Sequence, residues 1–494
     1  MFDLVGYLLI SVLGSIFTAL ITSSKKHWPL WSFEKKTILP SSWSFWARKA
    51  DSENTANDEV LQDIKNLAEC HETAALLDDL IHKDGAGEWP PRSNHAHTTW
   101  PAALRPYREI YEEMAPLLPR ANVSLDNEVN KARITDFRSR LRKLLHEEVK
   151  LDQVEQLLKA AEAGRWDVFP RETYNAFYCC IAWCRHAYRW ATIPVVSLAQ
   201  LETTLPLPPQ LALPWRYLQR HFGLTSESGN NMSNLVLNFD PQGPGSTYTY
   251  TLKINTGLSD DRITTSEEAF ARIFHDVERL ALPIYHAVVH ATTAFARGDA
   301  AACLAHTQRI TARLRPLLSS YYDRVHDARI ARDVWLSHVQ GFYAWGLGLE
   351  GEGEGDGDGD EERVKFDGLS GNQVLLFQVL DAFLGIKPYL SEENQNRNVP
   401  HRQRMFCKAV ETHSFRGRLA GDGLEGRIQG ELGEIVKRLR LFRTAHRTRA
   451  KVYLSQPAPE RLPMTAGKSL LKADMDQSLE FLDEFMVGRL AQTV

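Results

Sequence analysis

The sequence is poor in the features that mark several specialised classes of protein. It has only six cysteines in 494 residues, and no two of them form a CxxC pair. We therefore expect reduced thiols in a cytosolic setting, rather than disulfides or a cysteine zinc site. The cysteines are Cys70, Cys179, Cys180, Cys184, Cys303 and Cys407.

An excess of basic residues is also missing. Lys and Arg number 58 against 62 Asp and Glu, so the formal net charge is −4 and no nucleic-acid partner is expected. Hydrophobic residues make up 43% of the chain and charged residues 24%, which excludes a mostly disordered protein. The length exceeds what one simple core fills, so two packed domains are expected.

One apolar run stands out at the N-terminus. Leu4–Thr22 contains 19 residues without a charge, about the length that a helix needs to span a bilayer core. Asp3 is the only charged side chain before it, whereas a cleavable signal peptide begins with basic residues. Basic residues follow the run instead, at Lys25, Lys26, Lys35 and Lys36. The positive-inside rule then predicts a single-pass membrane protein whose later residues face the cytoplasm. A buried helix or a cleaved signal is the alternative.

Hydrophobic periodicity predicts an all-α protein with a small β-hairpin. We expect a transmembrane anchor at residues 1–24, a polar linker at 25–58, and a small helical domain at 59–222, with a new helix starting near Gln210. Residues 223–265 are expected to form a hairpin and connection, with strands at Asn234–Phe239 and Thr247–Ile254. A large helical domain follows at 266–494, and its acidic, Gly-rich segment at 350–362 is expected to be a solvated loop.

A histidine lies on the apolar face of the helix expected at Leu432–Leu454. Leu439, Phe442, His446 and Ala450 follow one another at three- and four-residue steps, so they share a face. Taken alone, His446 is either a core histidine satisfied by a hydrogen bond or a proximal haem ligand.

A carboxylate interrupts the apolar run of residues 374–385. Asp381 sits in a helix that is hydrophobic on nearly every side, and a buried carboxylate needs a charged or strongly hydrogen-bonding partner. It is either a structural Asp–Arg pair or, close to His446, a support for the imidazole. Two further histidines, His286 and His290, lie four residues apart on an expected helix. They can share a metal, but packed or solvated histidines are favoured because no HExxH or ExxH motif accompanies them.

Several motifs, taken in order, resemble the indoleamine 2,3-dioxygenases. Gly368-Leu-Ser-Gly-Asn-Gln373, followed by Leu376-Phe-Gln-Val-Leu-Asp381, is similar to the family's Gly-Gly-Ser-Ala-Gly-Gln and Phe-Gln-x-x-Asp elements. The helix of His446 resembles the family's proximal helix, with Arg443 three residues before the ligand position. Weaker matches lie at Ala187-Tyr-Arg-Trp190, Leu205-Pro-Leu-Pro-Pro209 and Pro400 to Phe406. The resemblance covers roughly residues 75 to 490.

The resemblance implies a two-domain helical fold with a b-type haem (heme b), and insertion of O2 across the indole C2–C3 bond of L-tryptophan. It implies His446 as the iron ligand and a monomeric catalytic domain. The cofactor-binding residues that it implies are His446, Arg443, Asp381, Ser370, Gly371 and Tyr188.

The residues expected to contact the substrate differ from those of the family. On the helix expected to lie over the haem, Phe270 keeps the family's aromatic residue, but the bulky Phe274 stands where the family has a small polar one. His275 is a candidate distal hydrogen-bond donor, although one residue further along a helix it can equally face away. The family's substrate-binding Arg falls on Val339 or Gln340.

Three functions therefore stay open. The leading one is a haem-dependent oxygenase that acts on an indole or related aromatic molecule. The second is a haem enzyme of the same fold that performs monooxygenation or rearrangement of a modified substrate. The third is a non-catalytic, membrane-bound haem-binding protein.

Overall fold

The described part of the chain is helical apart from one small sheet. The structure, a computed structural model, describes residues 57–118, 124, 126–189, 205–240, 246–252, 261–326, 328–343, 369–454 and 475–494. The all-α fold class expected from the periodicity is confirmed. Residues 58–494 group into one compact unit, and the division at 59–222 and 266–494 stays a prediction.

Residues 59–222 are helical over most of their described length. After a helix at residues 57–68 come α3 (Glu72–Lys83), α4 (Arg105–Met114), α5 (Asn127–Glu148), α6 (Leu151–Glu162), α7 (Arg171–Arg189) and α9 (Pro209–Phe222). The helix expected near Gln210 is α9. It ends at Gly223, whose backbone has a left-handed φ of 65°, and a Cβ there would lie 2.4 Å from the Cβ of His401. Glycine thus allows both the turn and the close approach of α16 (His401–Thr412).

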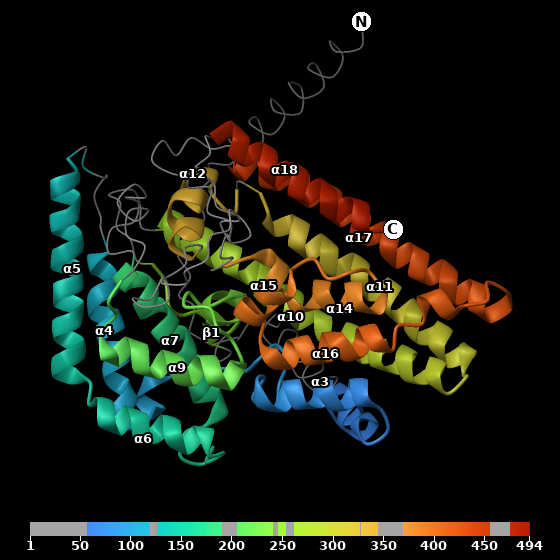
Figure 1. Ribbon diagram of the computed structural model, residues 1–494, viewed down its shortest axis with the longest axis horizontal. Helices are drawn as coiled ribbons and strands as arrows, with labels where there is room; N and C mark the ends of the chain where they lie inside the picture. Colours follow the sequence, from blue (N-terminus) through green and yellow to red (C-terminus); the bar gives the residue numbers. More distant parts are fainter. Residues whose placement is uncertain are drawn as a thin grey trace, which may run out of the picture. The chain divides into compact units, whose positions relative to one another are not determined.

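Long helices make up the second half of the chain. They are α10 (Asp261–Ala296), α11 (Ala300–Arg324), α14 (Leu375–Phe383), α15 (Glu392–Asn398), α16, α17 (Gly423–Leu454) and α18 (Met475–Gln492). Between α11 and α14 lie the short α12 (Arg332–Val334), the π-helical turn η5 (Trp335–Gln340), α13 (Gly341–Tyr343) and the 3-10 turn η6 (Gly371–Gln373). α10 packs along α11, α11 along α17, and α17 along α18, while α14 packs on α10 and α16 (Figure 1).

The predicted hairpin is much shorter than expected. Only β1 (Phe239–Asp240) and β2 (Thr247–Tyr248) pair, antiparallel, and Met232–Val236 forms the π-helical turn η4 instead of a strand. The expected strand at Asn234–Phe239 is therefore wrong over most of its length. Local polar side chains explain the difference, because the N–H of Ser233 donates to Asn230 Oδ1 at 3.0 Å and so favours a turn over a ladder.

The side chain of Asn238 continues the pairing beyond the two-residue strands. Its Nδ2 donates to the carbonyl oxygen of Tyr250 at 3.0 Å, and its Oδ1 accepts the Tyr250 N–H at 2.9 Å. The side-chain amide thus takes the place of a backbone peptide in the ladder.

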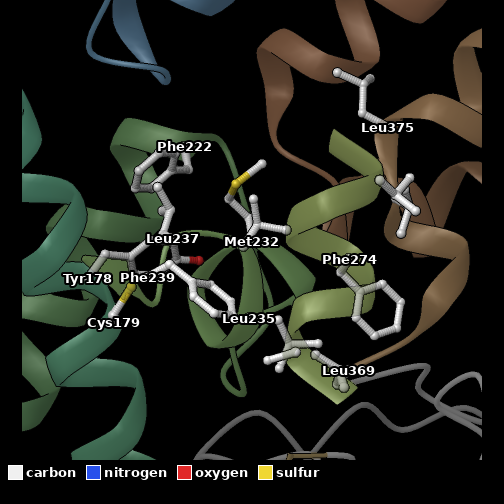
Figure 2. Packing of buried hydrophobic residues seen from close by; sticks show 14 of the residues in the cluster. Tyr178, Cys179, Phe222, Met232, Leu235, Leu237, Phe239, Phe274, Leu369 and Leu375 are labelled. Carbon is white, nitrogen blue, oxygen red and sulfur yellow. The ribbon is translucent and has the colours of Figure 1, made fainter. Parts of the chain in front are cut away.

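One large core extends from the helix at residues 57–68 to α17, and a small second cluster contains Leu390 and Val399. Figure 2 shows one part of it, where Leu235, Leu237 and Phe239 lie near Tyr178 of α7, with Phe274 of α10 nearby. Because α10 carries Phe274 on a buried face, this core sets the position of the residues that α10 presents to the site described below.

Several expected features lie outside the described residues. These are the anchor at 1–24, nearly all of the linker at 25–58, and the acidic loop at 350–362. Among the helices that the structure describes, none combines the length and the apolar character that a bilayer crossing needs.

Candidate functional site

A cavity of about 300 Å³ lies among α10, α11, α14 and α17, with η6, α15, α16 and α18 adding to its walls. Most of the side chains that line it are aromatic or aliphatic, and a small charged group adjoins them. A mostly apolar, concave space with a few polar groups is typical of a site for a small molecule or cofactor. Its lining includes Phe270, Phe274, Trp335, Phe377, Phe442 and His446.

His446 enters the cavity from α17, on the face that the sequence pattern predicted. Leu439 and Phe442 precede it by seven and four residues, and both are buried. The ring of Phe442 lies nearly parallel to the imidazole, at an angle of 12° and a centroid distance of 6.1 Å. Apolar packing on this side therefore directs the imidazole of His446 toward the cavity.

One ring nitrogen of His446 is held by a neighbouring helix. The hydroxyl of Tyr321, on α11, lies 3.2 Å from His446 Nδ1. Within the described part of the chain Nε2 makes no hydrogen bond, so it is the nitrogen that can bind a metal. Burial lowers the pKa of His446 to about 4, and the imidazole is therefore neutral at pH 7, as a metal ligand must be.

The aromatic wall from α10 is formed by Phe270 and Phe274. Their rings meet edge to face, with centroids 5.1 Å apart, and Trp335 of η5 packs against Phe270 at 5.8 Å. η6 lies close to this wall, since a Cβ on Gly371 would be 3.7 Å from Phe274 Cε1. Ser370 lines the cavity beside it and caps η6 by accepting the N–H of Asn372 at 3.2 Å.

Asp381, expected to need a charged partner, has two. Its carboxylate accepts two hydrogen bonds from Arg443 Nη2, at 2.8 and 2.9 Å, and a further one from Arg489 Nη2 of α18. The carboxylate is 5% exposed, and the two guanidinium groups are 10% and 11% exposed. One carboxylate facing two guanidinium groups leaves one surplus positive charge beside the cavity. Burial lowers the pKa of Arg443 and of Arg489 to about 10, so both stay charged at neutral pH.

Two expected site residues do not reach the cavity. His275 is half-buried on another side of α10, where its ring packs on Phe239 at a centroid distance of 4.5 Å. One residue beyond Phe274 is a rotation of about 100° around the helix, which is enough to turn it away. Tyr188 lies within α7, where its hydroxyl accepts a hydrogen bond from Arg142. The structure therefore does not bring His275 or Tyr188 to the site.

The remaining expectations concern the substrate side. Gln340 ends η5, and its side chain lies outside what the structure describes, whereas Val339 is fully buried. Arg404, which was part of a matching motif, does line the cavity. Its Nη1 donates to four backbone carbonyl groups, those of Gly223, Gln395, Asn396 and Val399.

Sequence reasoning missed two residues of the site. Tyr321 is one of the buried residues of α11. The sequence pattern of this helix does not indicate that the Tyr321 hydroxyl contacts His446. Arg489 comes from the last helix, 108 positions from Asp381. The buried carboxylate predicted a cation but not which one, so only the fold identifies the second arginine.

Fold and site together define a helical protein with an aromatic cavity that one neutral imidazole enters from a long helix. The chain belongs to the indoleamine 2,3-dioxygenase family, because the family model described as "IDO: Indoleamine 2,3-dioxygenase" matches residues 140–481. This membership puts it in a class of haem-dependent oxidoreductases of the dioxygenase type. A search of curated proteins finds no match.

Proposed function

We propose that this chain binds one haem b, with Nε2 of His446 as the protein ligand to the iron. The observation that carries the proposal is a neutral imidazole that lines an aromatic cavity while Tyr321 fixes its other nitrogen. An imidazole that ligates a metal is usually oriented in this way by a hydrogen bond at its second nitrogen. Phe270, Phe274 and Phe442 offer the apolar contact surface that a porphyrin face needs.

The charged group at the edge of the cavity suits the rest of the cofactor. A haem carries two propionate groups, and the surplus positive charge shared by Arg443 and Arg489 would attract an anion there. Asp381 holds both guanidinium groups in place before any ligand arrives. We therefore assign Asp381, Arg443 and Arg489 to haem binding, with Ser370 and Gly371 as part of the cavity wall.

The proposed reaction is the insertion of O2 into an indole or related aromatic molecule. The haem supplies the chemistry that activates oxygen. The protein's own residues position the partners: Tyr321 holds the imidazole, and the phenylalanines of α10 exclude water and contact an aromatic ring.

For the substrate, we propose an aromatic compound that is larger or less anionic than L-tryptophan. Val339 or Gln340 occupies the place of the family's substrate-binding Arg, and neither side chain carries a charge. Arg329 and Arg332, which precede them in the sequence, are not among the cavity's lining residues. Losing an ion pair of about 2–3 kcal/mol would weaken transition-state binding by roughly 30- to 150-fold.

The test of haem ligation compares two half-buried histidines. His446→Ala is expected to fold but to lose most of its haem, measured by the Soret band of the purified protein. His275→Ala is the matched control, because His275 is also half-buried but packs on Phe239 rather than lining the cavity. Normal haem content and an unchanged iron coordination spectrum in His446→Ala would refute the assignment.

The substrate test uses steady-state kinetics of the haem-loaded, reduced protein. L-tryptophan, tryptamine and larger indoles are compared, with oxygenated products identified by mass spectrometry, in the wild type and in Gln340→Arg. We expect weak turnover of L-tryptophan and a gain in kcat/KM for it in the variant. Turnover of L-tryptophan at an efficiency typical of a dedicated enzyme would contradict the proposal. Haem binding without product from any aromatic compound would favour the non-catalytic alternative.

We also propose that residues 4–22 anchor the protein in a membrane, with the family domain on the cytoplasmic side. The support is the uncharged run followed by basic residues. Deleting residues 1–24 should move the protein from the membrane fraction to the supernatant with its haem retained. A deletion variant that stays with the membrane would exclude this anchor.

A further inference from the structure

A second cluster of chemistry-bearing side chains lies away from the haem cavity. His286 and His290 lie four residues apart on α10, and Asp63 on the helix at residues 57–68 reaches both of them. Asp63 Oδ2 is 2.6 Å from each Nε2 atom, and the two Nε2 atoms are 3.0 Å apart. Three donor atoms of metal-binding type therefore converge on one point, from segments more than 200 residues apart in sequence.

The spacing and chemistry of these atoms suit a divalent transition metal. Donor atoms in a tetrahedral zinc site, with bonds of about 2.0–2.1 Å, lie about 3.3 Å from one another. The two Nε2 atoms are close to that separation at 3.0 Å, whereas Asp63 Oδ2, at 2.6 Å from each, would have to move outward by about 0.7 Å to bind the same ion. Two imidazoles and one carboxylate are a ligand set that zinc accepts, and four residues is the helical spacing that places two histidines on the same face.

The surroundings support the same assignment. His286 and His290 are 17% and 21% exposed, and Asp63 is 44% exposed, so a metal ion and water can reach the site. His306 of α11 stacks on His290 with ring centroids 4.4 Å apart and an angle of 5°. This stacking fixes the orientation of the His290 ring.

We propose that Asp63, His286 and His290 form a zinc site that fastens the helix at residues 57–68 to α10. Water would complete the coordination. Both segments that the metal joins are described helices, and α10 also carries the phenylalanines of the haem cavity. The site would secure the first helix of the described chain, whose docking otherwise depends on apolar contacts such as those of Ile64. It is separate from the haem cavity and does not depend on the proposed oxygenase activity.

The experiment is a zinc titration of the purified, haem-loaded full chain. Haem occupies His446, which prevents zinc from binding there. Isothermal titration calorimetry should show one equivalent of Zn²⁺ in the wild type. The affinity should fall at least tenfold in Asp63→Asn, His286→Asn and His290→Asn. His146→Asn is the matched control, since His146 is exposed on α5, and its affinity should equal that of the wild type.

Hydrogen exchange gives a second readout that does not depend on calorimetry. Zn²⁺ should slow amide exchange in residues 57–68 of the wild type and leave exchange in Asp63→Asn unchanged. Asp63→Asn keeps the size of the side chain, and its Soret band and circular dichroism report whether it has folded. Absence of stoichiometric zinc binding, or equal affinity in the wild type and all three variants, would overturn the proposal.

Discussion

Asp381→Asn removes the single carboxylate that two buried arginines share. The carboxylate accepts three hydrogen bonds, two from Arg443 and one from Arg489, and all three groups are about nine-tenths buried. Removing one partner of a buried ion pair costs about 3–5 kcal/mol, because the charge that remains is desolvated and unpaired. We therefore expect the free energy of unfolding to fall by about 3–5 kcal/mol at pH 7.

The chain offers a matched control on α17 and α18, the two helices that carry Arg443 and Arg489. Arg447 of α17 forms a two-point pair with Asp483 of α18, at 2.6 Å for both contacts, but these side chains are 35% and 23% exposed. Asp483→Asn makes the same chemical change in a solvated place, where water screens the pair and the loss of stability should be much smaller. The two variants therefore differ mainly in burial.

Urea denaturation followed by circular dichroism measures Asp381→Asn, Asp483→Asn, Arg489→Met and the double variant that combines Asp381→Asn with Arg489→Met. Because Arg489→Met removes one of the unpaired cations, the double variant should lose less stability than the sum of the two single variants. The m-value should stay constant if only the stability of the folded state changes. Equal losses for Asp381→Asn and Asp483→Asn would refute the argument that burial makes the Asp381 cluster strong.

Two further predictions concern His446 and His95. Tyr321→Phe removes the hydroxyl 3.2 Å from His446 Nδ1. The rate of haem loss should therefore rise about tenfold, and the Raman frequency of the iron–histidine bond should shift. Tyr322→Phe is the control and should change neither quantity, because the Tyr322 hydroxyl donates to the carbonyl of Phe442 instead. Burial lowers the pKa of His95 to about 4, below the ordinary value of 6.5, so its contribution to stability is present above pH 6.5 and is lost as the pH falls toward 4. In His95→Gln, the dependence of unfolding free energy on pH between 6 and 4.5 should be flatter by about 1.4 kcal/mol per pH unit, and an unchanged slope would contradict the pKa shift.

Two features of the site could be predicted from the sequence: the direction in which His446 points and the charged partner of Asp381. Apolar side chains at three- and four-residue steps share one face of α17, and His446 lies on that face, so the sequence predicted that it points into the interior. Asp381 was expected to have a cationic partner because an unpaired buried carboxylate is too costly, and Arg443 is that partner. Each of these inferences needed only the residue's own segment and one physical rule.

Features that depend on distant segments were not predictable. Asp63 meets His286 across 223 positions, and no pattern in either segment identifies the other, so packed or solvated histidines were the favoured reading. The prediction of a long first strand in the hairpin was wrong for a different reason. Alternating residues at 234–239 resemble a strand, but the side chain of Asn230 supplies a local hydrogen bond that a ladder would otherwise provide.

The arrangement of charge in the cavity bears on what it can accept. Three arginines line the described part of the cavity, and each already has partners within the chain: Arg443 and Arg489 are bound to Asp381, and Arg404 to backbone carbonyl groups. The surplus positive charge of Arg443 and Arg489 is the one proposed to bind the haem propionates, so a substrate carboxylate would have to compete with those propionates or with the backbone bonds of Arg404. An aromatic ring can pack on Phe270 and Phe274 of α10 without breaking any hydrogen bond, because these side chains make apolar contacts. Selection in this cavity should therefore follow the shape and size of an aromatic ring system more than the charge attached to it.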